Sequence, residues 1–186
     1  MRIIGGERRG LKLAEVGAGD AAAHLRPTSD RVREAIFNLL TNGRSGDVVR
    51  GARVLDLFAG TGALGLEALS RGAVEAVLVD SGRVAQGIIR RNIGLMGAGV
   101  PATLLARDAT ALGMNSGEGF GLVFLDPPYG KGLGEKALVS ARAGGWIAPG
   151  AVVVWEEAAE PAPPEGFTLT DRRRYGGTAV TVLTTR

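Results

Sequence analysis

Short apolar runs alternate with longer amphipathic segments through the middle of the chain. The apolar runs carry few polar residues on either face, which is typical of parallel strands covered by helices on both sides. We predict strands at 53–58, 76–80, 102–106, 122–125 and 152–155, and helices at 63–71, 84–96 and 132–144. This alternation favours an α/β fold with a doubly wound, mostly parallel sheet.

The segment 28–40 predicts a further helix that Thr28 or Ser29 caps at its N-terminus. Its apolar residues recur at helical spacing and form one stripe. Arg31 and Arg33 fall off that stripe, so we expect both arginines to face solvent or a ligand.

The chain closes with apolar runs at 168–175 and 178–184, separated by Gly176-Gly177. This spacing predicts an antiparallel hairpin at one edge of the sheet, which brings the expected total to seven strands. We divide the chain into a short N-terminal arm with one helix, residues 1–50, and a main domain, residues 51–186.

Composition narrows the class of protein. The 186 residues suit one domain, and no apolar run approaches the roughly 20 residues that a membrane span needs. The first six residues lack the apolar core of a secretory signal. The absence of cysteine and the single histidine, His24, exclude thiolate and multi-histidine metal sites. We therefore expect a cytoplasmic, metal-free monomer that does not bind membranes.

Charge is distributed unevenly along the chain. Residues 1–50 hold nine Lys/Arg and six Asp/Glu, whereas residues 51–186 hold thirteen of each. A basic N-terminal arm suggests a polyanionic partner such as a nucleic acid. On charge alone, a solvated surface explains the same excess equally well.

A glycine-rich loop follows the first predicted strand of the main domain. Gly60, Gly62 and Gly65 satisfy the G-x-G-x-x-G spacing, and Asp80 ends the next strand. Glycines let a backbone turn tightly against a ligand, and an acid at that position accepts hydrogen bonds from ribose hydroxyls. The spacing alone also fits a nicotinamide cofactor, which leaves an oxidoreductase as one alternative.

Further acids favour a cationic cofactor. Asp56 lies just before the loop, where it would repel a pyrophosphate but attract the ammonium and sulfonium of S-adenosylmethionine. After the third strand, Asp108 and Ala109 offer a carboxylate and a backbone amide for an adenine ring. Asp56, Asp80, Asp108 and Asp126 thus fall at the C-terminal ends of four successive predicted strands, at the edge where open α/β sheets bind ligands.

The run Asp126-Pro127-Pro128-Tyr129 follows the fourth predicted strand. The exocyclic amine of a nucleobase is a poor nucleophile because its lone pair is delocalised into the ring. The Asp126 carboxylate and the Pro127 carbonyl can accept its two N–H bonds, and the two prolines fix the turn. Tyr129 can stack on the base and align the amine with a sulfonium methyl group. The run therefore predicts methyl transfer to an amine on a flat ring.

The Asp-Pro-Pro-Tyr run resembles the signature of adenine-N6, cytosine-N4 and guanine-N2 methyltransferases. The segments 2–13, 25–38 and 54–72 are similar to the RsmD-type bacterial family, and the resemblance covers essentially the whole chain. It implies a class I methyltransferase that modifies N2 of a guanine in 16S ribosomal RNA within the small subunit or its assembly intermediate.

The resemblance also implies roles for three groups of residues. The catalytic group that holds the guanine amine is Asp126, Pro127, Pro128 and Tyr129. The group that binds S-adenosylmethionine is Asp56, Phe58, Gly60, Gly62, Asp80, Asp108 and Ala109. The group that contacts RNA is Arg8, Arg9, Lys12, Arg26, Thr28, Arg31 and Arg33. The alternatives are a DNA adenine-N6 or cytosine amino-methyltransferase and an RNA-binding assembly factor without chemistry.

Overall fold

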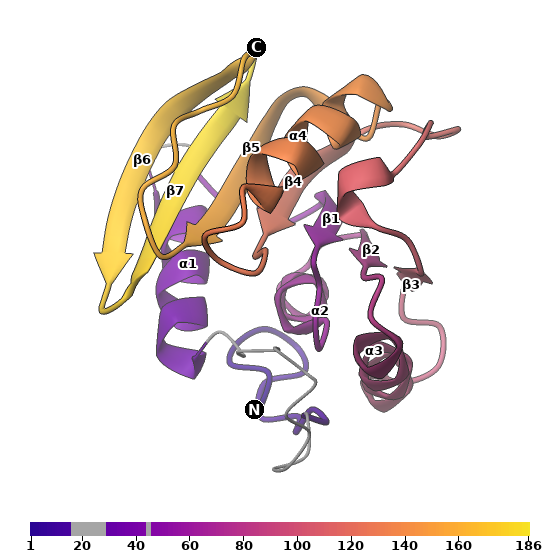
Figure 1. Cartoon of the computed structure of the whole chain (residues 1–186). Helices are drawn as coiled ribbons and strands as arrows, with labels where there is room; N and C mark the ends of the chain where they lie inside the picture. Colours follow the sequence, from indigo (N-terminus) through magenta and orange to yellow (C-terminus); the bar gives the residue numbers. More distant parts are fainter. Residues whose placement is uncertain (16–28, 44–45) are drawn as a thin grey trace.

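The computed structural model describes residues 1–15, 29–43 and 46–186. Its centre is a seven-stranded sheet with the strand order β3-β2-β1-β4-β5-β7-β6 (Figure 1). The five strands β1 to β5 are parallel to one another, whereas β7 runs antiparallel to both of its neighbours, β5 and β6. The predicted class is therefore confirmed: a mostly parallel, doubly wound sheet that ends in an antiparallel hairpin.

The predicted elements are present, and most of their ends lie within two residues of the predicted positions. The strands are β1 (Arg53–Leu57), β2 (Glu75–Val79), β3 (Ala102–Leu105), β4 (Phe120–Leu125), β5 (Ile147–Glu157), β6 (Phe167–Tyr175) and β7 (Thr178–Thr185). The helices are α1 (Asp30–Asn42), α2 (Ala63–Ser70), α3 (Arg83–Met96) and α4 (Leu133–Ala143), with a short 3₁₀ turn, η1 (Ala109–Ala111).

Strand β5 departs most from the prediction, because it begins at Ile147 rather than at Val152. Pro149-Gly150 marks a break in the sequence, yet Ile147 already pairs with Phe120 of β4. A register shift after Phe120 absorbs the irregular residues. An apolar run interrupted by Pro and Gly therefore continues here as one strand.

Two hydrophobic cores lie on opposite faces of the sheet. One face packs against α1, α2 and α3, and the other against α4 and η1 (Figure 1). The first core includes Ile3 and Leu13 of the N-terminal arm together with Phe37 of α1. The arm and α1 thus share a core with the main domain rather than packing as a separate unit.

The register of the parallel strands defines the edge where the site lies. Leu57 of β1 pairs with Val79 of β2 and with Leu125 of β4, and Leu125 pairs with Trp155 of β5. The residues that follow each of these positions therefore emerge along one line, at the carboxyl ends of the strands. Within the described part of the chain, none of the helices is long and apolar enough to cross a membrane.

Candidate active site

The loop between β1 and α2 is held in a strained, tight turn. Phe58 has a positive φ of 59°, an uncommon conformation for a residue with a side chain, and Gly60 and Gly62 have φ of 58° and 77°. The Ala59 amide donates to the carbonyl of Val79, at 2.9 Å. Strain of this kind concentrates at ligand-binding sites, and here it keeps the loop backbone directly above the strand ends.

Asp80 ties two loops together at the end of β2. Its Oδ2 accepts a hydrogen bond from the Gly60 amide at 2.9 Å, and its Oδ1 accepts one from the Gly82 amide at 2.8 Å. The side chain is only partly buried, so its carboxylate oxygens can accept further bonds. Asp80 thus fixes the glycine loop and offers an acceptor beside it.

Asp56 is almost completely buried within β1, at 1% exposure. Its Oδ2 accepts from the Gly65 amide in the first turn of α2, at 2.9 Å. Burial raises the pKa of Asp56 to about 7, and the nearby charges of Asp126 and Asp80 add to the rise. The residue therefore holds α2 against the sheet and places negative charge beneath the loop, rather than at its surface.

Asp108 begins η1, at the neighbouring loop after β3. Its Oδ1 accepts from both the amide and the hydroxyl of Thr110, each at 2.8 Å. The Asp108 side chain is exposed, whereas Ala109 is buried. The carboxylate is accordingly held in a defined orientation at an exposed position.

The Asp126–Tyr129 turn leaves the sheet beside the glycine loop. The Asp126 amide donates to the Leu57 carbonyl at 3.3 Å, which joins the end of β4 to the end of β1. Asp126 and Tyr129 are partly buried. Burial first, and then the Asp126 charge, raises the pKa of Tyr129 to about 12, although a hydrogen bond with the Thr178 side chain opposes the rise. Tyr129 is therefore a neutral phenol at neutral pH.

Two acids at the end of β5 belong to the same edge and were absent from the sequence prediction. Glu157 accepts from the Gly130 amide at 3.1 Å and so supports the residue after Tyr129. Glu156 is 2% exposed, and its charge, like that of Glu157, contributes to the raised pKa of Tyr129. The predicted strand ended at Trp155, yet the signal was the same as at the other strands: an apolar run that ends in an acid.

Comparison with known proteins identifies the family to which this chain belongs. The family described as conserved hypothetical protein 95 matches residues 1–184. "Ribosomal RNA small subunit methyltransferase D" of Escherichia coli is 37% identical over 96% of this chain and 87% of its own length. The chain belongs to the methyltransferase D family.

Solved structures of related chains share the fold of this methyltransferase. The yhhF protein of Escherichia coli is 37% identical, with a TM-score of 0.83 over 100% of this chain and 97% of that chain. TrmN from Thermus thermophilus is 27% identical, with a TM-score of 0.66 over 88% of this chain and 51% of that chain. The sheet is therefore that of the class I methyltransferases.

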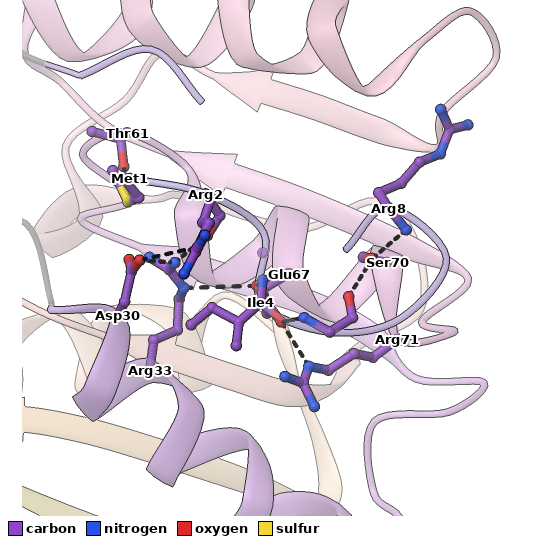
Figure 2. A network of polar contacts seen from close by, with 12 residues as sticks. Met1, Arg2, Ile4, Arg8, Asp30, Arg33, Thr61, Glu67, Ser70 and Arg71 are labelled. Atoms are coloured by element: carbon purple, nitrogen blue, oxygen red, sulfur yellow. Dashed lines mark hydrogen bonds and ion pairs between the residues drawn. The ribbon is translucent and has the colours of Figure 1, made fainter. Parts of the chain in front are cut away.

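One residue expected to face RNA in this methyltransferase D family member is buried instead. Arg33 has no exposed surface, and its guanidinium points toward the N-terminal arm and α2 (Figure 2). It pairs with Asp30 at 2.9 Å, lies 3.7 Å from Glu67 and donates to the carbonyl of Arg2. The expectation that Arg33 faces solvent or a ligand is wrong, because its side chain is buried within the protein beside Glu67, a buried acid on α2.

The other residues expected to contact RNA divide into two groups. Arg8, Arg9, Lys12 and Arg31 are exposed on the arm and α1. Arg26 and Thr28 lie outside the described residues. The observed cap of α1 is Ser29, whose hydroxyl oxygen accepts a hydrogen bond from the Val32 amide at 3.3 Å.

Glu67 is the anchor of the N-terminal arm. Its Oε2 accepts from the Ile4 amide and its Oε1 from the Gly5 amide, both at 2.8 Å, and Arg71 pairs with Oε1 at the same distance (Figure 2). Ser70 adds a hydrogen bond from the Arg8 amide at 2.9 Å. These contacts hold the arm on α2, the helix that follows the glycine loop.

Proposed function

We propose that this chain transfers a methyl group from S-adenosylmethionine to the exocyclic N2 of a guanine in 16S RNA of the small ribosomal subunit. The observation that carries the proposal is the turn from Asp126 to Tyr129, which leaves the sheet beside the Gly60 loop and its partner Asp80. The name of the Escherichia coli relative supports the choice of substrate.

The residues around the glycine loop fit this cofactor. Gly60 and Gly62 bring the backbone close to a ligand, and the partly exposed carboxylate of Asp80 suits ribose hydroxyls. Asp108 and Ala109 would hold the adenine ring. Burial, and after it the charges of Asp126 and Asp80, raises the pKa of Asp56, and a cation nearby would favour its ionised form. When bound, S-adenosylmethionine supplies an electrophilic methyl group on a positively charged sulfur.

The turn residues would prepare the amine for attack. Asp126 and the Pro127 carbonyl accept the two N–H bonds, which favours a pyramidal nitrogen with a localised lone pair. Pro127 and Pro128 have no amide hydrogen and a fixed φ, so the acceptors stay in place. Tyr129, which is neutral and hydrogen-bonded with Thr178, would stack on the base. Positioning and acceptor geometry would then provide most of the rate enhancement.

The RNA would be held by the exposed basic residues of the arm and α1. Arg8, Arg9, Lys12 and Arg31 offer charge for phosphate contacts, which position RNA without reading its sequence. Arg26 and Thr28 would contribute by the family likeness. Anchoring of the arm through Glu67 would keep these charges in a fixed position relative to Asp126.

Methyl transfer from labelled S-adenosylmethionine to small subunits, naked 16S RNA and duplex DNA tests the proposal. We expect label in small subunits, where guanine N2 is modified, and loss of transfer in Asp126→Ala with cofactor binding retained. Glu165→Ala, which changes an exposed acid near β6, serves as the control and should keep full transfer. Preferential labelling of DNA, or undiminished transfer by Asp126→Ala, would contradict the proposal.

A further inference from the structure

Helix α3 is the most basic helix of the described structure. It carries three arginines and no acidic residue. In the other helices, α1 holds two arginines and two acids, α2 holds a single acid, and α4 holds two cations and one acid. The main domain as a whole holds thirteen Lys/Arg and thirteen Asp/Glu, so its net charge does not reveal this local excess. Positive charge is therefore concentrated on one element of a domain that is neutral overall.

The three arginines lie on the outward face of α3. At 3.6 residues per turn, Arg83, Arg90 and Arg91 fall within about a third of the helix circumference. All three are exposed, and the buried residues of α3 lie on the opposite side. Gly87 and Gly94 lie between the arginines, and an added Cβ at either glycine would meet nothing within 4 Å. The α3 face, defined by Arg83, Arg90 and Arg91, is thus an open row of charges.

The charges of the α3 face are free to meet a ligand. Within the described part of the chain, none of its three guanidinium groups forms an ion pair or a hydrogen bond. The arginines of β6 differ in this respect, because Arg172 pairs with Glu160 at 3.3 Å and Arg173 with Asp171 at 3.0 Å. A phosphate that binds the α3 face therefore displaces no protein partner.

The α3 face continues the basic surface of the N-terminal arm. The arm is fastened to α3 through Asn92, whose side chain accepts from the Ala14 amide at 2.7 Å and donates to the Ala14 carbonyl at 3.1 Å. At the C-terminal end of α3, an added Cβ at Gly97 would lie 3.3 Å from the Nη1 of Arg8. Arg8 of the arm thus adjoins the helix, and α3 begins three residues after Asp80, beside the glycine loop.

We propose that the α3 face is a second RNA-binding surface, on which Arg83, Arg90 and Arg91 contact phosphates of the RNA that the arm holds. From Arg83 to Arg91 the row extends about 12 Å, a length over which a nucleic acid strand presents several phosphates. The inference rests on the proposed function and adds to it a path for the RNA, from Arg8 along α3 to the glycine loop. These contacts position the RNA without reading its sequence.

The first test removes charge from the part of the α3 face that lies farthest from the cofactor loop. Arg90→Gln combined with Arg91→Gln should weaken binding to small subunits at least about tenfold and lower the salt dependence of the affinity by about two units of slope. Binding of S-adenosylmethionine should be unchanged, which shows that the variant is folded. An unchanged affinity and slope would overturn the inference.

The matched control carries the same loss of charge at the opposite edge of the sheet. Arg142 and Arg186 are exposed, and they bond to the neighbouring residues Glu165 and Gly166. Arg142→Gln combined with Arg186→Gln should leave both the affinity and the slope unchanged. An equal loss in this control would overturn the assignment to α3. If the Arg90 and Arg91 variant lost binding to phosphatidylserine vesicles but kept its RNA affinity, the α3 face would bind a membrane surface instead, which would also overturn it.

A second test locates the RNA directly. The chain has no cysteine, so one substitution gives a unique thiol that can carry an iron chelate, whose hydroxyl radicals cleave nearby RNA. Val84 of α3 and Val139 of α4 are both exposed, at 44% and 56%, and lie on opposite faces of the sheet. In complexes with small subunits, the probe on Val84→Cys should cleave 16S RNA and the probe on Val139→Cys should not. No cleavage from position 84, or equal cleavage from both positions, would overturn the inference.

Failure of the proposed function gives a different result. In that case the wild-type enzyme leaves guanine N2 of small subunits unmethylated, whatever the two binding tests show. Failure of this inference alone leaves wild-type methylation intact, while the Arg90 and Arg91 variant binds small subunits as tightly as the wild type does.

Discussion

The Nε of Arg33 lies 3.7 Å from the Oε2 of Glu67, and neither side chain has any exposed surface. The pair joins α1 to α2, and Glu67 in turn binds the backbone of Ile4 and Gly5 in the N-terminal arm (Figure 2). A charge pair in this position organises three segments that are far apart in the sequence.

Removal of one partner should destabilise the protein strongly. Arg33→Met leaves Glu67 buried with less compensating charge, and such changes typically cost about 3–5 kcal/mol. Urea unfolding of Arg33→Met should therefore show a large loss of free energy of unfolding. Arg31→Met, an exposed neighbour on α1, should change it by less than about 0.5 kcal/mol. Similar values for the two variants would contradict the buried pair.

Arg33 shows where sequence patterns are insufficient. The apolar stripe of α1 was sufficient to predict the helix. The cap was predicted as Thr28 or Ser29, and the structure shows Ser29 in that position. Periodicity describes one helix at a time, however, and a position off the stripe is assumed to be solvated. The acid that pairs with Arg33, Glu67, lies on α2. The guanidinium of Arg33 also donates to a backbone carbonyl of the N-terminal arm, that of Arg2. Only the tertiary arrangement brings these groups together.

Asp56 should make stability depend on pH in an unusual direction. Its pKa is about 7 in the folded state, against 3.8 for an unperturbed carboxyl, so the folded protein binds this proton more tightly than the unfolded chain does. Its contribution to the free energy of unfolding therefore falls as the pH rises between these two values.

Asp56→Asn removes this titration and keeps an oxygen for the Gly65 amide. At pH 8 the variant should be more stable than the wild type by roughly 2–4 kcal/mol, and at pH 4 by less than about 1 kcal/mol. Urea unfolding at both pH values measures the difference. A constant difference, or a variant less stable at pH 8, would be incompatible with a pKa raised by burial.

Gly62 should be essential for the glycine loop. Its φ is 77°, and an added Cβ would lie 3.0 Å from the Cδ1 of Leu78. We expect Gly62→Ala to distort the loop, lower the affinity for S-adenosylmethionine at least tenfold and cost about 1 kcal/mol or more of stability. Isothermal titration and urea unfolding test the two effects.

Gly87→Ala provides the control for this substitution. Gly87 lies within α3, and an added Cβ would meet nothing within 4 Å. The variant should bind the cofactor normally and gain up to about 1 kcal/mol of stability, because alanine favours a helix. Equal behaviour of the Gly62 and Gly87 variants would show that the loop does not need its left-handed glycine.

The exposed basic residues should control RNA affinity without affecting the cofactor. Arg9→Glu combined with Arg31→Glu should weaken binding to small-subunit RNA and reduce the salt dependence of the affinity by about one unit of slope for each lost phosphate contact. Arg142→Glu, on α4 across the sheet, is the control and should leave both unchanged. An equal loss in the control would indicate a general charge effect.

The candidate site was predictable where an acid follows an apolar run directly. Asp80 and Asp126 were found in this way, and the structure places them one residue beyond β2 and β4. Glu156 directly follows the predicted strand 152–155 and fits the same rule, yet it was not among the predicted site residues; in the structure it lies within β5, which extends to Glu157. The face to which each acid projects depends on strand register, which the pattern of one strand does not contain.

Mapping of the methylated nucleotide tests the central claim most directly. Small subunits from cells that lack this protein would be treated with the purified enzyme and S-adenosylmethionine, and their 16S RNA digested and analysed by mass spectrometry. The account predicts one new N2-methylguanosine at a single position, which is absent when Asp126→Ala is used. Methylation of an adenine or cytosine amine, or no methylation of the RNA, would contradict it.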